Sequence, residues 1–270
     1  MSFQSFIPTF FRTSLILAIT AMSLAASLAS AATPKSKTEN LIYKFGPGVY
    51  EGLITRPKAG KGKLPAVLLI HNWMGVTDET KKQAERIADL GFVALSADIY
   101  GQDVRPKNPQ EAGAVATKYK SDRSLFRERL NLALKTLLAQ TDVDSSRVFA
   151  VGYCFGGTGV IELARSGAAI KGVVSFHGGL DSPASALGAK IKTKILALHG
   201  ADDPFVSPED LAAFEKEMRD HKVDWQLIKF GGAVHSFTDV GAGNDNTKGA
   251  AYNAAADARS FQAFKDFVSL

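Results

Sequence analysis

"RVFAVGYCFGGTGVIELA" (residues 147–164) joins an apolar run to a helix-like segment through a glycine turn that holds the chain's single cysteine, Cys154. A side chain on such a sharp strand-to-helix turn projects into solvent, and the turn requires very small residues two positions before and after it. Gly152 and Gly156 meet that demand. The stretch therefore predicts a nucleophile elbow of the form G-x-C-x-G, with a helix N-terminus that favours a thiolate.

The turn has two other interpretations. Cys154 could be a small buried hydrophobic residue, which is the common role of an unpaired cysteine. A dinucleotide-binding loop is the second alternative, but the glycines at 152, 156, 157 and 159 do not have the G-x-G-x-x-G spacing.

Apolar runs alternate with segments of helical period on both sides of the elbow. Strands are predicted at 66–71, 92–98, 147–153, 172–177, 194–200 and 225–230, and helices at 77–91, 121–139, from Ser207 and at 248–267. Strands separated by helices of this length form a mostly parallel central sheet with helices on both faces. Residues 41–46 and 49–55 predict an antiparallel hairpin at its N-terminal edge, so the fold class is α/β.

The first 31 residues have the pattern of a cleavable secretory signal: Arg12, an apolar stretch from Leu15, and the small residues 29–31. A retained membrane anchor is the alternative. We therefore expect a signal peptide at 1–31, a single domain at 32–270, and a periplasmic or secreted protein. The scattered cations of the mildly basic remainder indicate neither nucleic-acid binding nor stable membrane association after cleavage.

An acid and a histidine follow the elbow in the order that a hydrolase of this fold requires. "LALHGADDPFV" (196–206) places Asp202 and Asp203 just beyond a predicted strand, and "FGGAVHSF" (230–237) places His235 in a glycine-rich loop after the next one. Either acidic residue could be the partner of the histidine. Three matches in the required order favour catalysis over a structural role.

The sequence resembles the dienelactone hydrolase family of α/β-hydrolases from about Gly48 to the C-terminus, on "GYCFGG", "DDPFV" and "HSF". The resemblance implies an α/β-hydrolase fold, Cys154 as nucleophile, His235 as base and Asp203 as acid, with Asp202 in reserve. It also implies an oxyanion hole made by the backbone N–H groups of Phe155 and Trp73, a pocket position for Tyr100, and no cofactor or metal.

Two positions depart from the family pattern. Asn72 stands where the family has a glutamate that accepts the thiol proton, and an amide cannot do so. Asp239 stands where the family has an arginine that clamps the substrate's carboxylate. If Asp239 faces the acyl group, a neutral substrate is expected rather than an anionic one, and the source of thiol activation is left open.

The other histidines are not expected to take part directly in catalysis. His71, His177 and His199 end apolar runs, so we expect them to line or support the site, and we expect His221 to face solvent at a helix end. None forms a metal-binding motif with carboxylates at helical spacing.

The sequence thus predicts an exported hydrolase that cleaves a small ester or lactone through a cysteine thioester, without a cofactor. The alternative is a non-catalytic binding or thiol redox-sensitive protein on a hydrolase scaffold, because fold does not fix function.

Overall fold

The computed structural model describes residues 35–269, and eight of its strands form one sheet in the order β1-β2-β4-β3-β5-β6-β7-β8. The strands are β1 (Ser36–Phe45), β2 (Gly48–Pro57), β3 (Leu64–Ile70), β4 (Val93–Ala97), β5 (Val143–Tyr153), β6 (Gly172–Phe176), β7 (Lys194–Gly200) and β8 (Trp225–Phe230). Neighbours from β4 to β8 pair in parallel, whereas β2 is antiparallel to both β1 and β4. The predicted parallel sheet with an antiparallel N-terminal edge is confirmed.

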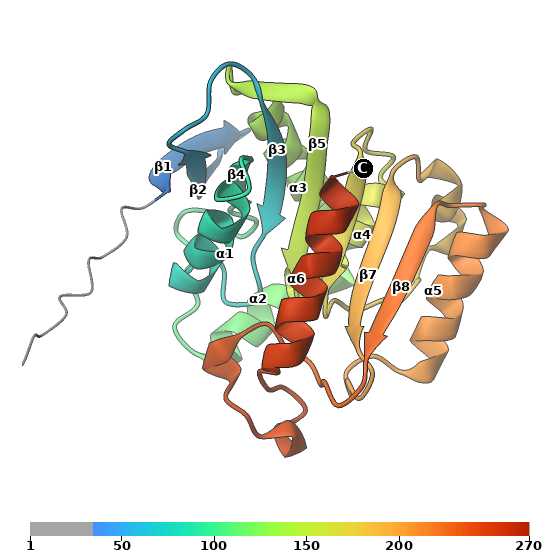
Figure 1. The fold of residues 1–270 in the computed structure, drawn as a ribbon. Helices are drawn as coiled ribbons and strands as arrows, with labels where there is room; N and C mark the ends of the chain where they lie inside the picture. The colour runs from blue at the N-terminus through green and yellow to red at the C-terminus, as the bar shows by residue number, and fades with distance from the viewer. Residues whose placement is uncertain (1–34, 270) are drawn as a thin grey trace, which may run out of the picture. The chain divides into compact units, whose positions relative to one another are not determined.

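Helices cover both faces of this sheet. They are α1 (Asp78–Ala88), α2 (Pro109–Ser121), α3 (Arg123–Leu138), α4 (Phe155–Arg165), α5 (Pro208–Asp220) and α6 (Ala254–Val268). Figure 1 shows α1 and α6 in front of the sheet and α3 and α4 behind it. Successive strand residues alternate between faces, so Leu68 packs in the cluster of Phe126 and Leu69 in the cluster of Ile87. Both faces are therefore apolar, which explains the continuous hydrophobic runs.

One helix was absent from the prediction. The segment expected as a helix at 121–139 is α3, which begins after its N-cap Asp122, and α2 precedes it. The buried face of α2 carries mainly small residues, Ala112 and Ala116, so its apolar periodicity is weak. Its start follows an ordinary rule nonetheless, because the Asn108 side chain caps it and Pro109 occupies the first turn.

The C-terminal helix begins later than the predicted residue 248. Gly249 has a φ of 77°, and the Asn253 side chain accepts a hydrogen bond from the N–H of Ala256 at the start of α6. Between them, Ala250 forms a β-bridge with His235. Alanine-rich composition suggested helix here, but the chain uses this segment to anchor the histidine loop.

The predicted signal peptide at 1–31 lies outside the described residues. Within residues 35–269, no helix has the length and apolar character needed to cross a membrane.

Candidate active site

Cys154 lies on a strained turn between β5 and α4. Its φ is 54° and its ψ is −114°, a conformation that non-glycine residues rarely adopt. A Cβ at Gly152 would come within 1.9 Å of the Gly156 carbonyl oxygen, and a Cβ at Gly156 within 2.2 Å of the Ile70 carbonyl oxygen. The backbone around the thiol therefore admits only glycine at both positions, as the elbow motif predicts.

The imidazole of His235 bridges the thiol and a buried carboxylate. Its Nε2 lies 3.0 Å from the Cys154 Sγ, and its Nδ1 lies 2.8 Å from Asp203 Oδ2. The other oxygen of Asp203 accepts a hydrogen bond from the N–H of Phe205 at 2.9 Å. The Asp202 carboxylate instead accepts from the N–H of Gly232 at 3.0 Å, so it braces the histidine loop without reaching the ring.

The loop that carries His235 is held on two sides. The N–H of His235 donates to the carbonyl of Gly249 at 3.1 Å, and its own carbonyl accepts from the N–H of Ala251 at 3.0 Å. The ring of His177, on the other side, lies 2.8 Å through its Nε2 from the Thr238 hydroxyl. These contacts fix the backbone on either side of the imidazole.

Electrostatics favour a charged pair. Burial acts to raise the pKa of the Cys154 thiol, but the hydrogen bond and charge of His235 and the N–H of Phe155 outweigh it and lower the pKa. Burial acts to lower the pKa of His235, but hydrogen bonds to Asp203 and Cys154 raise it above its ordinary value. Both shifts therefore favour the thiolate–imidazolium form of the pair over the neutral form.

A cavity of about 560 Å³ opens over the thiol and the imidazole. Trp73 and Phe205 are large apolar side chains of its wall, and Lys120 on α2 adds a cation whose charge also lowers the pKa of Cys154. No aspartate or glutamate of residues 35–269 lines this cavity. A second hollow of the same volume lies between β1 and α3, but neither cysteine nor histidine lines it.

Three predicted pocket residues do not line the cavity. The Asn72 side-chain oxygen accepts from the N–H of Met74 at 2.9 Å, and the Tyr100 hydroxyl donates to the carbonyl of Trp73 at 2.9 Å, so both hold the loop after β3. Asp239 accepts a hydrogen bond from the N–H of Gly241. Burial is the largest cause that raises the pKa of Glu79 on α1, and the negative charge of Asp239 is the second. Asp239 is thus absent from the cavity lining, and the expected preference for a neutral substrate stays a prediction.

The model of the dienelactone hydrolase family matches residues 50–269. The chain belongs to this family. It is therefore a hydrolase that acts on lactone or ester bonds.

Several other proteins are similar to this chain over most of its length. A probable 2-oxo-3-(5-oxofuran-2-ylidene)propanoate lactonase of Bradyrhizobium is 31% identical over 186 residues, which cover 65% of this chain and 74% of the relative. A putative carboxymethylenebutenolidase of Synechocystis is 27% identical over 227 residues, which cover 79% of this chain and 89% of the relative. A crystal structure of a dienelactone hydrolase-like promiscuous phosphotriesterase from metagenomic libraries is 39% identical, with a TM-score of 0.83 over 87% of this chain and 98% of the other.

The remaining histidines of this dienelactone hydrolase family member lie mostly behind the site. His71, His177 and His199 are buried, and burial lowers the pKa of each, which favours the neutral ring in all three. His221 caps α5 and is partly buried, with its Nε2 3.1 Å from the Ser185 carbonyl, so it is less exposed than expected. Within residues 35–269, no cluster of three or more histidine, cysteine or acidic side chains is placed to hold a metal ion.

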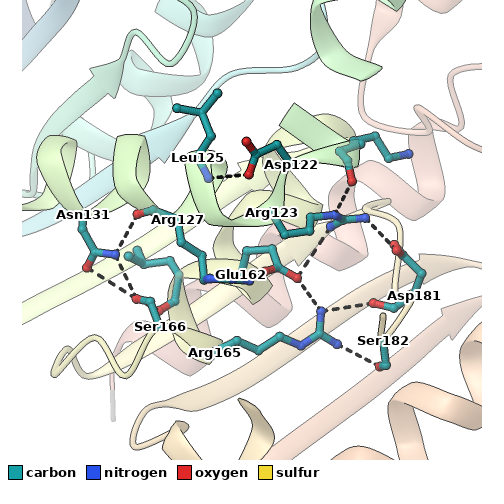
Figure 2. Close-up of polar contacts among 12 residues, drawn as sticks. Asp122, Arg123, Leu125, Arg127, Asn131, Glu162, Arg165, Ser166, Asp181 and Ser182 are labelled. Atoms are coloured by element: carbon teal, nitrogen blue, oxygen red, sulfur yellow. Dashed lines mark hydrogen bonds and ion pairs between the residues drawn. The ribbon is translucent and has the colours of Figure 1, made fainter. Parts of the chain in front are cut away.

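An ionic network links α3, α4 and the loop after β6 (Figure 2). The Arg123 guanidinium donates to Asp181 at 2.6 Å and to the Lys120 carbonyl at 2.7 Å, which ties the end of α2 to the loop after β6. Glu162 on α4 accepts from Arg127 and from Arg165 at 2.6 and 2.8 Å. The network joins α4, the helix that follows Cys154, to α3 and to the end of α2.

Sequence reasoning missed Lys120 and Ala250 as wall residues. Lys120 lies on the unpredicted α2, and the start signal at Asn108-Pro109 would have located that helix. Ala250 lies in a segment predicted as helix, and the glycine at position 249 would have indicated a break before it.

Proposed function

We propose that the protein is an exported hydrolase that cleaves a small carboxylic ester or lactone through a thioester on Cys154, with His235 as base and Asp203 as the acid that orients it. One observation carries the proposal: the two imidazole nitrogens lie 3.0 Å from the thiol and 2.8 Å from the carboxylate. This is the nucleophile, base and orienting-group geometry of covalent acyl transfer.

The thiolate attacks the carbonyl carbon, and the oxygen becomes an oxyanion held by the N–H groups of Phe155 and Trp73. The C–O bond to the leaving alkoxide then breaks, and the His235 imidazolium gives it a proton. In the second half, neutral His235 takes a proton from water, and the resulting hydroxide attacks the thioester. Collapse of the second oxyanion releases the acid and regenerates the thiolate.

The cavity wall bears on the substrate class. Its apolar side chains suit a hydrocarbon or aromatic group, and Lys120 suits an anionic group at the rim. The Bradyrhizobium relative is named as a lactonase for a propanoate, which is an anion. We therefore propose that small lactones or esters bearing an anionic group are accepted together with neutral ones.

The test is hydrolysis of p-nitrophenyl acetate by purified protein, with the acyl-enzyme trapped by acid quench and located by mass spectrometry. An acetyl group on Cys154 and loss of turnover in Cys154→Ala support the proposal. Full turnover in Cys154→Ala contradicts the cysteine mechanism, and no turnover of any ester in the wild type supports a binding or redox-sensitive protein. Export is tested separately, by the N-terminal sequence of protein from the periplasm or medium.

A second candidate is phosphotriester hydrolysis at the same site, favoured by the 39% identity to a promiscuous phosphotriesterase. Attack of the Cys154 thiolate on phosphorus would expel the aryloxide, and water would then cleave the S–P bond. Turnover of diethyl p-nitrophenyl phosphate that is lost in Cys154→Ala supports this activity. A stable phosphorylated cysteine without turnover would indicate inhibition instead.

A further inference from the structure

His71, which directly follows β3, is hydrogen-bonded through both ring nitrogens. Its Nε2 lies 3.3 Å from the backbone nitrogen of Ile99, whose N–H must donate, so Nε2 is the acceptor. The proton is therefore on Nδ1, which donates to the carbonyl oxygen of Asn72 at 2.5 Å. The Ile99 N–H on one side and the Asn72 carbonyl on the other therefore hold the ring in a single tautomer.

The Asn72 carbonyl belongs to the same peptide group as the N–H of Trp73. Among the hydrogen bonds within residues 35–269, that N–H donates to no protein acceptor, and Trp73 lines the cavity beside Cys154. A carbonyl that accepts a strong hydrogen bond makes the N–H of its own peptide a better donor, because hydrogen bonds in a chain polarise one another.

We propose that His71 is a positioning residue that orients and polarises the Asn72–Trp73 peptide, so that the Trp73 N–H stabilises the oxyanion formed at Cys154. This inference rests on the proposed cysteine mechanism and assigns a function to a histidine outside the triad. The hydrogen-bonded chain runs from the Ile99 N–H through the imidazole to the Asn72 carbonyl and on to the reacting oxygen.

Burial and stacking keep the His71 ring fixed in place and neutral. The ring has 0% exposure and lies stacked at 13° on Phe155, whose own N–H is the other proposed oxyanion donor. Burial lowers the pKa of His71 to about 4, so the ring stays neutral at ordinary pH. A neutral donor on a fixed ring needs no reorganisation when the oxyanion forms.

The next peptide group, Trp73–Met74, is also fixed by hydrogen bonds. The Tyr100 hydroxyl donates to the Trp73 carbonyl, and the Asn72 side-chain oxygen accepts from the N–H of Met74, each at 2.9 Å. Both polar groups of the Trp73–Met74 peptide are thus occupied, which restricts rotation about the bonds flanking Trp73. The loop is held on one peptide by His71 and on the next by Tyr100 and Asn72.

The test uses two amide variants. In His71→Asn the side-chain NH₂ replaces the Nδ1 donor, whereas in His71→Gln the amide reaches the Nε2 position and cannot donate to the Asn72 carbonyl. We expect kcat/KM for p-nitrophenyl acetate to fall about 10- to 100-fold in His71→Gln, less than the loss of a whole oxyanion donor, and to stay several-fold higher in His71→Asn. His71→Phe, which keeps the stack on Phe155, should match His71→Gln.

A second measurement separates this role from damage to the fold. Alkylation of Cys154 by iodoacetamide forms an S–C bond and expels iodide without an oxyanion, so its rate should stay near the wild-type rate in all three variants. Unchanged kcat/KM in the folded glutamine and phenylalanine variants, equal losses in the two amide variants, or parallel losses of turnover and alkylation would each overturn the inference. Turnover that persists in Cys154→Ala would instead refute the mechanism on which it rests.

Discussion

The Nε2 of His235 lies 3.0 Å from the Cys154 Sγ although 81 residues separate them in the chain. The contact depends on the strained elbow on one side and on the loop anchored by Gly249 and Ala251 on the other. In the proposed mechanism this nucleophile and this base therefore act as one unit.

The first prediction follows from that unit. Cys154→Ala and His235→Ala should each remove nearly all hydrolysis of small activated esters, and the double variant should be no worse than either single one, because each loss removes the same step. Steady-state kinetics with p-nitrophenyl esters measure this. Additive losses in the double variant would mean that the two side chains act in separate steps.

The second prediction separates the two aspartates. Asp203→Asn should lower kcat severely, about 10⁴-fold as for the equivalent change in a serine triad, because the amide favours the wrong imidazole tautomer. Asp202→Asn is the matched control, since its oxygen still accepts from the Gly232 N–H and does not touch the ring. The reverse order would assign the orienting role to Asp202.

The third prediction concerns Lys120 at the cavity rim. Lys120→Gln should reduce kcat/KM for a p-nitrophenyl ester with a free carboxylate about two- to fivefold more than for the matching methyl ester, the range of an exposed ion pair, because any effect of the lost charge on the thiol is common to both esters. The preference for the anion should also weaken as salt rises. Equal effects on both esters would show that the lysine acts on packing or on the thiol, and not on substrate charge.

The fourth prediction concerns the network behind the site. Arg165 is 1% exposed and binds both Glu162 and Glu217, so Arg165→Met leaves buried carboxylates with fewer partners and should lower the free energy of unfolding by roughly 3–5 kcal/mol. Urea unfolding measures it. Adding Glu217→Leu should restore part of the loss, and a double variant less stable than the single one would contradict this explanation.

Local rules on the sequence were sufficient for the sheet, the elbow and the order of the site residues. Gly152 and Gly156 have a steric requirement that no other residue meets, and continuous apolar runs fit strands buried on both faces. Such features depend on neighbours in the chain, so they can be read from the chain itself.

Features that depend on tertiary contacts were not predictable in the same way. Asp239 follows His235 by four residues, but its carboxylate accepts a hydrogen bond from the Gly241 N–H and does not line the cavity, which no pattern indicates. Lys120 enters the cavity wall because α2 packs there on small alanines. The role of His71 required knowing that Ile99 supplies its second hydrogen bond.

The last prediction concerns how the lone thiol is activated. The Asn72 side chain is an amide already bound to the Met74 N–H, so the remaining sources are the His235 cation, the Phe155 N–H and Lys120, all of which lower the pKa of Cys154. The thiolate should therefore exist before substrate arrives, and iodoacetamide should alkylate the resting enzyme at pH 6–7 faster than a model thiol of pKa about 8.5. A lowered thiol pKa means that reactivity persists as pH falls below 8.5 and is lost only when pH falls through the lowered value. His235→Gln should move that loss of reactivity back toward pH 8.5, because the variant lacks the imidazolium that does most to offset the effect of burial on the thiol pKa. Alkylation of free enzyme no faster than the model thiol, with acceleration only when a substrate analogue is bound, would mean that substrate triggers activation by another group.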